Sequence, residues 1–165
     1  MVFLIECILG CIIFTVPLII LSKNPLASIY NYPPAIIKRV KEMGIIDDTQ
    51  ALDPKHVILK KGLAALIIAF LCMLIVWYVN GARTFWQGTL ITYALWSVVN
   101  WYDAFVIDCL WFCHSKRFII PGTEDLEKDY LDYGFHIRGS LKGQLIGIPV
   151  ACLVGCMTIL FSFIA

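Results

Sequence analysis

Four stretches of the sequence are so long and so apolar that they restrict the chain to one kind of environment. They cover residues 2–21, 62–79, 85–112 and 143–165. A helix needs about 20 residues to cross a hydrocarbon core about 30 Å thick, and each stretch meets or approaches that length. Because lipid offers no partner to exposed backbone groups, all four are expected to be helical. The sequence therefore predicts an all-α integral membrane protein, a four-transmembrane-helix bundle forming a single membrane domain.

The composition agrees with a lipid environment and excludes several functional classes. Hydrophobic residues make up 60% of the 165 residues and charged residues only 15%, too apolar for a soluble domain of this size. A formal net charge of +1 provides no basic surplus for binding nucleic acid. The seven cysteines are an odd number, and all but Cys113 lie inside apolar runs, so no disulfide framework is expected. The first run contains Glu6 and no basic segment precedes it, so we interpret it as a retained helix.

Basic residues are concentrated in two of the segments between the apolar runs. Twelve of the thirteen Lys and Arg residues lie in residues 22–61 and 113–142, whereas the short hairpin 80–84 contains only Arg83. Loops rich in Lys and Arg stay on the cytoplasmic side of a membrane. Both large loops are therefore expected in the cytoplasm, with the hairpin and both termini outside.

The two cytoplasmic loops contain helix signals of their own. In the first loop, two prolines precede residues 35–43, which are amphipathic and are expected to form a helix at the membrane surface. Asp53 and Pro54 then suit the N-cap and first position of the second membrane helix. In the second loop, residues 120–123 suit a type II turn, after which Thr123 is expected to cap a short helix that Gly134 ends.

Small residues recur at every fourth position of the last apolar run. They are Gly143, Gly147, Ala151 and Gly155. On a helix they share one side and allow a neighbouring backbone to approach closely. The pattern is compatible with a homo-oligomer seam and equally with packing inside one bundle.

The third run is the most polar, and its polar residues fall on one side of a helical wheel. They are Thr89, Tyr93, Ser97, Asn100, Asp103 and Asp108. An ionisable residue near the bilayer centre costs at least about 2.5 kcal/mol, so this side is expected to face the bundle interior. The acids and the following loop suggest a polar pocket open to the cytoplasm, and imidazoles and carboxylates of this kind can bind a metal or move protons. The candidate catalytic residues are Asp103, Asp108 and His114, and the candidate substrate-binding residues are Asn100, Lys116, Arg117, Glu124 and His136.

Several functions are compatible with this pattern. The leading interpretation is a site that binds or acts on a lipid or lipophilic molecule, built on the end of the third helix and the loop after it. The first alternative is a homo-oligomeric transporter or channel lined by Asn100 and Asp103, and the second is an accessory subunit whose acids are structural. No paired metal-ligand spacing and no nucleotide-binding or hydrolase motif is present, so cofactor and enzyme class stay open.

The expected topology resembles that of one known group of enzymes. With outside termini, a long first cytoplasmic loop and a short outer hairpin, the chain is similar to small four-helix membrane enzymes that conjugate glutathione to lipophilic substrates. The basic, Asn-containing signature on the second helix of those enzymes is absent, because residues 62–79 contain no Arg, Asn or Glu. The resemblance therefore covers topology alone.

Overall fold

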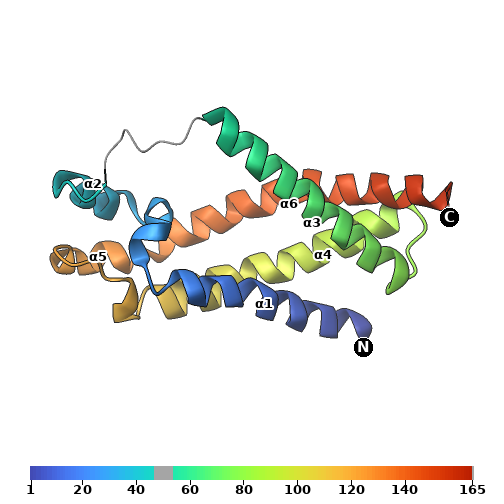
Figure 1. Ribbon diagram of the computed structural model, residues 1–165. Helices are drawn as coiled ribbons and strands as arrows, with labels where there is room; N and C mark the ends of the chain where they lie inside the picture. Colours follow the sequence, from blue (N-terminus) through green and yellow to red (C-terminus); the bar gives the residue numbers. More distant parts are fainter. Residues whose placement is uncertain (47–53, 165) are drawn as a thin grey trace. The chain divides into compact units, whose positions relative to one another are not determined.

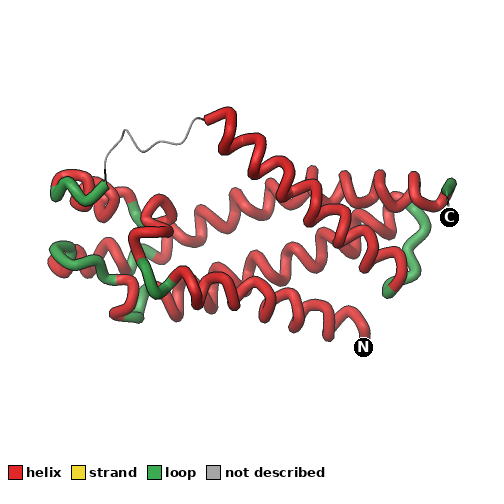
Figure 2. Tube along the Cα trace, viewed as in Figure 1, coloured by secondary structure: helices red, strands yellow, loops and turns green. Residues whose placement is uncertain are grey.

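Every regular element of the chain is helical in the computed structural model, which describes residues 1–46 and 54–164 (Figures 1 and 2). The α-helices are α1 (Val2–Leu21), α2 (Pro34–Glu42), α3 (Pro54–Tyr78), α4 (Phe85–Tyr102), α5 (Glu127–Tyr130) and α6 (Tyr133–Ser162). The 3-10 helices η1 (Pro25–Asn31), η4 (Lys116–Phe118) and η5 (Glu124–Leu126) are short, and the π-helix η3 (Asp103–Phe112) continues α4. No strand occurs in the described ranges, so the all-α prediction is confirmed.

Three helices are long and apolar enough to cross a membrane. They are Val2–Leu21, Phe85–Phe112 and Tyr133–Ser162, and their length and hydropathy support association with a membrane. The predicted run 62–79 covers the second part of α3, which ends at Tyr78 and of which Ala65–Tyr78 forms a shorter apolar helix. The fourth span therefore stays a prediction. α3 begins at Pro54, as its position predicted, whereas the proposed N-cap Asp53 lies outside the described residues.

The last helix begins well before the predicted residue 143, at Tyr133. The Asp132 side chain accepts a hydrogen bond from the backbone N–H of Phe135 at 2.9 Å. A carboxylate in this position satisfies an otherwise unpaired N–H group of the first turn. Gly134, which was expected to end a helix in the preceding loop, instead lies inside α6, so that prediction is wrong.

The chain divides into two compact units, which are described separately. The first comprises Met1–Gly10, Leu52–Asn100 and Lys142–Ala165, and the second comprises Cys11–Ala51 and Trp101–Leu141. In the first unit, the small residues of α6 face α4. A Cβ atom added at Gly147 would overlap the Trp96 ring, and one at Gly155 would lie 2.7 Å from the Phe85 carbonyl oxygen. Gly143, Gly147 and Gly155 all meet α4 in this way and Ala151 is buried, so the small-residue stripe packs inside the chain, and an oligomer seam stays a prediction.

The hairpin between α3 and α4 in the first unit is organised around Trp77. Its ring packs against Phe161 with centroids 4.9 Å apart, and the Arg83 guanidinium carbon lies 3.8 Å from the Trp77 ring centroid. Arg83 Nη1 also donates to the Trp77 carbonyl oxygen at 2.8 Å. The single basic residue of the hairpin is therefore held by a cation–π contact and a hydrogen bond.

The second unit has an aromatic core centred on Tyr32. Its ring meets Phe112 edge-on with centroids 4.8 Å apart, and Tyr130 with centroids 6.1 Å apart. The Tyr32 hydroxyl donates to the Phe118 carbonyl oxygen at 3.2 Å. Burial raises the pKa of Tyr32 well above its usual value of 10, so this hydroxyl stays a donor. The segment around Tyr32 thus packs against residues 112–130, which lie far away in the sequence.

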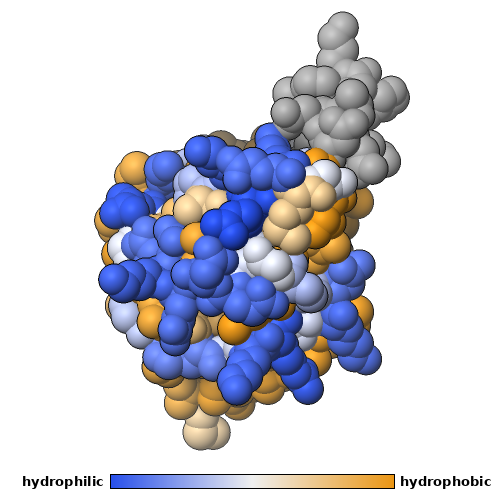
Figure 3. Space-filling model, turned by 90° about the vertical axis from the view of Figure 1, so that its left-hand side faces the viewer, coloured by the Kyte–Doolittle hydropathy of each residue, from blue (hydrophilic) through white to orange (hydrophobic). Residues whose placement is uncertain are grey.

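Helix α2 adds its apolar side to this core. Ile36 and Val40 are fully buried, whereas Lys38 and Lys41 on the other side are exposed. Arg39 makes two hydrogen bonds to the Asp125 carboxylate, at 3.1 and 3.0 Å, and so joins α2 to η5. Hydrophilic side chains gather on the end of the molecule that carries α2 and α5 (Figure 3). Whether α2 lies on a membrane surface stays a prediction.

The predicted turn at residues 120–123 is confirmed. Gly122 has a φ of 89°, which a type II turn requires at its third position, and the Thr123 N–H donates to the Ile120 carbonyl at 3.0 Å. Thr123 does not cap the following helix, so that prediction is wrong. Its buried hydroxyl instead donates to the Ile120 carbonyl at 2.7 Å and lies 2.8 Å from the Tyr130 hydroxyl.

Candidate functional site

The π-helix η3 sets the position of the two acids that the sequence singled out. Its backbone hydrogen bonds skip five residues, and the last of them joins the Cys113 N–H to the Asp108 carbonyl at 3.0 Å. On an α-helix, residues five apart point about 140° away from each other. The wider turn of a π-helix brings Asp103 and Asp108 closer to one side. Such helices are rare and occur frequently at functional sites.

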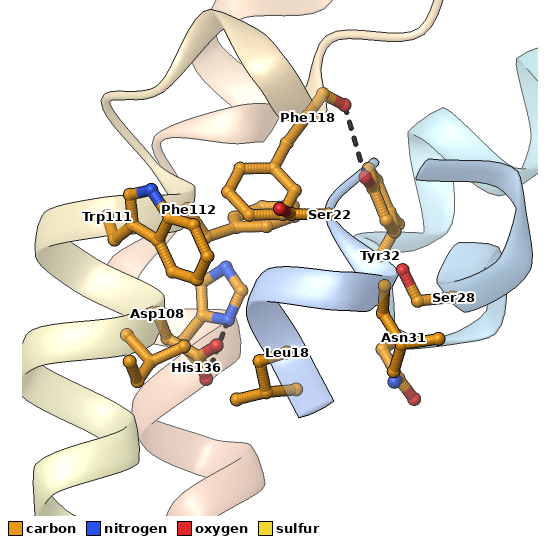
Figure 4. A pocket seen from close by; sticks show the side chains of 12 residues that line it. Leu18, Ser22, Ser28, Asn31, Tyr32, Asp108, Trp111, Phe112, Phe118 and His136 are labelled. Atoms are coloured by element: carbon orange, nitrogen blue, oxygen red, sulfur yellow. Dashed lines mark hydrogen bonds and ion pairs between the residues drawn. The ribbon is translucent and has the colours of Figure 1, made fainter. Parts of the chain in front are cut away.

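Asp108 pairs with His136, which lies at the end of the first turn of α6. His136 Nδ1 is 3.1 Å from Asp108 Oδ2 (Figure 4). The His136 side chain is only 4% exposed, whereas Asp108 is 28% exposed. The early start of α6 at Tyr133 is what gives His136 a fixed helical position beside η3. The structure thus joins one predicted catalytic residue to one predicted binding residue.

The second ring nitrogen of His136 is buried and has no hydrogen-bond partner among the described residues. The ring is fixed by edge-on contacts with Phe112 and Phe135, whose centroids lie 5.1 and 5.2 Å away. A buried polar atom without a partner costs about 1–3 kcal/mol, so such an atom calls for an explanation. Binding of a ligand at this nitrogen would provide one.

A pocket of about 90 Å³ lies beside this pair (Figure 4). Its polar lining consists of Ser22, Ser28, Asn31, Tyr32, Asp108 and His136. Its apolar lining consists of Leu18, Leu21, Ile107, Trp111, Phe112 and Phe118. Leu21 and Asn31 are exposed, so the wall of the pocket reaches the molecular surface. Neither Lys nor Arg occurs among the lining residues.

The other predicted catalytic residues lie near this pocket without lining it. Asp103 is half-buried and interacts electrostatically with both Asp108 and His136. His114 is exposed; its Nδ1 lies 3.1 Å from the Cys109 carbonyl oxygen and its Nε2 lies 3.2 Å from the Tyr133 hydroxyl. Both ring nitrogens of His114 are therefore occupied by structural contacts.

Three of the predicted binding residues are exposed and do not line the pocket. They are Lys116, Arg117 and Glu124. Glu124 accepts a hydrogen bond from the Gly122 N–H at 2.8 Å, which supports the turn. Arg117 uses its backbone N–H to bond Ser115 Oγ at 3.3 Å. The predicted ring of charged residues at a pocket mouth is therefore not assembled around Asp108 and His136.

Asn100 belongs to the first unit and to a different polar cluster. Its amide Nδ2 donates to Gln144 Oε1 at 3.2 Å, and Gln144 Nε2 in turn donates to Ser97 Oγ. Trp96 Nε1 donates to the Gly143 carbonyl oxygen at 3.1 Å. These hydrogen bonds join α4 to α6. The polar side chains of two apolar helices thus find their hydrogen-bond partners on each other.

Sequence reasoning missed the contribution of the segment directly after the first apolar run. Ser28, Asn31 and Tyr32 lie in or next to η1 and form the polar wall that faces the acid–imidazole pair (Figure 4). The available signal was a short polar segment that interrupts the hydrophobic pattern close to the membrane boundary. Tyr32 itself carries no motif.

The described residues contain no group of three or more His, Cys, Asp or Glu side chains suited to a metal ion. No disulfide joins any of the seven cysteines, all of which lie in the described ranges. Burial, reinforced by the neighbouring Cys109 thiol and by two acids, raises the pKa of the Cys113 thiol to about 12, which disfavours the reactive thiolate. The chain matches no model of a known protein family, no curated protein and no solved structure.

Proposed function

We propose that this membrane protein binds a lipid or another lipophilic molecule at the pocket beside Asp108 and His136. The observation that carries the proposal is the buried His136 ring, whose Nε2 has no partner among the described residues and whose Nδ1 is held by a carboxylate. A pocket with a few polar groups among aromatic walls is the usual form of a site for such a ligand.

The size of the pocket limits how the ligand binds. Sites that enclose a whole small molecule have about 300–1,000 Å³, and this pocket has about 90 Å³. It therefore takes one polar group and the adjoining carbons, while the remaining chain lies along the apolar surface outside. Leu21, which is exposed and lines the pocket, provides the continuation of that surface.

The proposal is one of binding, and catalysis is not part of it. A carboxylate-oriented imidazole is also the general base of many hydrolases. The two serines of the lining are engaged elsewhere, since Ser22 Oγ donates to the Ile19 carbonyl at 2.8 Å and Ser28 Oγ to the Pro25 carbonyl at 3.3 Å. A nucleophile poised at His136 is therefore missing from the described lining.

Replacement of His136 by phenylalanine tests the site. The ring shape is kept and both nitrogens are removed, so the protein purified in mild detergent is expected to retain at least about fivefold less lipid by mass spectrometry. His114→Phe is the matched control, because this exposed imidazole lies outside the pocket. Ser28→Phe, which fills the pocket and leaves the pair in place, is expected to reduce lipid retention as well. Equal retention by all three variants and the parent would contradict the proposal.

The proposed orientation places the pocket on the cytoplasmic side, since the basic loops border it. A cysteine introduced by Arg83→Cys is expected to react with an impermeant maleimide in intact cells. One introduced by Lys128→Cys is expected to react only after permeabilisation. The parent chain measures labelling of the native thiols. Labelling of residue 128 in intact cells, before permeabilisation, would mean that the pocket lies on the outer side of the membrane.

A further inference from the structure

The lining of the pocket contains neither Lys nor Arg, and its polar groups favour a ligand that donates a hydrogen bond. Resting on the proposed function, we propose that the ligand is an uncharged lipid with a free hydroxyl group, and that this hydroxyl donates a hydrogen bond to His136 Nε2. A monoacylated or diacylated glycerol is a lipid of this class. The proposal rests on the geometry of the ring, the charges around it and the volume beside it.

The tautomer of the His136 imidazole decides which of its nitrogens can accept a hydrogen bond from a ligand. An ionised carboxylate can only accept hydrogen bonds, so the Nδ1 atom that lies 3.1 Å from Asp108 Oδ2 carries a proton. In the neutral imidazole the other nitrogen is then an acceptor. This is the nitrogen that is buried without a partner among the described residues. It lies on the side of the ring away from Asp108, directed toward the aromatic side chains of the lining (Figure 4).

The charges around the pocket decide which lipid head groups it can accept. A phosphate or carboxylate head group is normally met by Arg, Lys or a helix N-terminus. The pocket has neither Lys nor Arg in its lining, and its charged group is the Asp108 carboxylate. Asp103 adds a second acid within electrostatic range of His136. An anionic head group would therefore be repelled, whereas a hydroxyl carries no charge and supplies the donor that Nε2 requires.

The volume of the pocket limits the size of the head group. About 90 Å³ accommodates a hydroxymethyl group and its neighbouring carbons rather than a bulky polar head. Trp111, Phe112 and Phe118 provide apolar walls for those carbons. Ser28 and Asn31 form the opposite wall (Figure 4). The arrangement is matched by the glycerol end of a neutral lipid.

Three lipids with the same acyl chains test this assignment. Binding of 1,2-dioleoylglycerol, 1,2-dioleoyl-3-acetylglycerol and dioleoylphosphatidic acid is measured by native mass spectrometry on the purified full chain and on His136→Phe. The parent is expected to bind dioleoylglycerol at least about tenfold more tightly than the acetylated lipid, which cannot donate to Nε2. Phosphatidic acid is expected to bind more weakly still. His136→Phe is expected to lose the preference, and free glycerol is expected not to compete, because it lacks the chains.

The outcomes separate the two proposals. If the acetylated lipid or phosphatidic acid binds as tightly as dioleoylglycerol, and binding still depends on His136, the site takes a lipid but the hydroxyl assignment is wrong. If no lipid distinguishes the parent from His136→Phe, the proposed function itself is wrong. Thermal unfolding of both proteins shows whether loss of binding reflects loss of the fold. Should His136→Phe not fold, Ser28→Phe is measured instead: because it fills the pocket, it is expected to bind dioleoylglycerol no more tightly than the acetylated lipid, and an unchanged preference would contradict this site.

Discussion

Gly155→Leu is expected to destabilise the protein by about 3 kcal/mol or more. A Cβ atom at this position would lie 2.7 Å from the Phe85 carbonyl oxygen and 3.0 Å from the Phe85 ring, and it would overlap Thr89 Oγ1. A backbone carbonyl on α4 cannot rotate away as a flexible side chain can, so the two helices must separate. The measurement is thermal unfolding of the detergent-solubilised protein, together with its yield.

Gly139→Leu is the matched control on the same helix. A Cβ atom at Gly139 would meet nothing within 4 Å, and leucine is the better helix former. This variant is expected to melt at the same temperature as the parent or above it. If Gly155→Leu melts no earlier than Gly139→Leu, the close contact between α4 and α6 in the first unit does not exist as described.

Tyr32→Ala is expected to cost about 3–5 kcal/mol of local stability in the second unit. The change removes a buried ring from its contacts with Phe112 and Tyr130, and it leaves the Phe118 carbonyl without its hydroxyl donor. Because these contacts all lie within the second unit, hydrogen exchange measured by mass spectrometry should accelerate in residues 112–130. Exchange within residues 85–100 should change little.

Tyr30→Ala provides the control for this change. Tyr30 lies two residues away and is 64% exposed, so its truncation removes little packing. Its exchange pattern is expected to match that of the parent. Equal protection of residues 112–130 in both variants would mean that Tyr32 does not hold the loops together.

Part of the candidate site was accessible from the sequence. Asp108 and His136 were both singled out, one as an acid in a membrane span and the other as a histidine in the following loop. Their pairing was not predicted, because it depends on where α6 begins and on the π-helical turn of η3. A helical wheel assumes an α-helix throughout, so it placed Asp103 and Asp108 on the polar side but could not show the π-helical turn that sets their positions. The pocket wall from η1 depends on contacts between segments far apart in the chain, as the Tyr32–Phe118 hydrogen bond across 86 residues illustrates.

The sequence by itself determined the features that local chemistry controls. Long apolar runs become helices because each backbone group finds its partner within the same segment, and Gly122 takes the positive φ that its turn requires. The tertiary structure decided which residues meet: Gly155 with α4, Tyr32 with two distant loops, and His136 with Asp108. Those contacts join segments far apart in the chain, and their free energy depends on shape and burial that no local pattern contains.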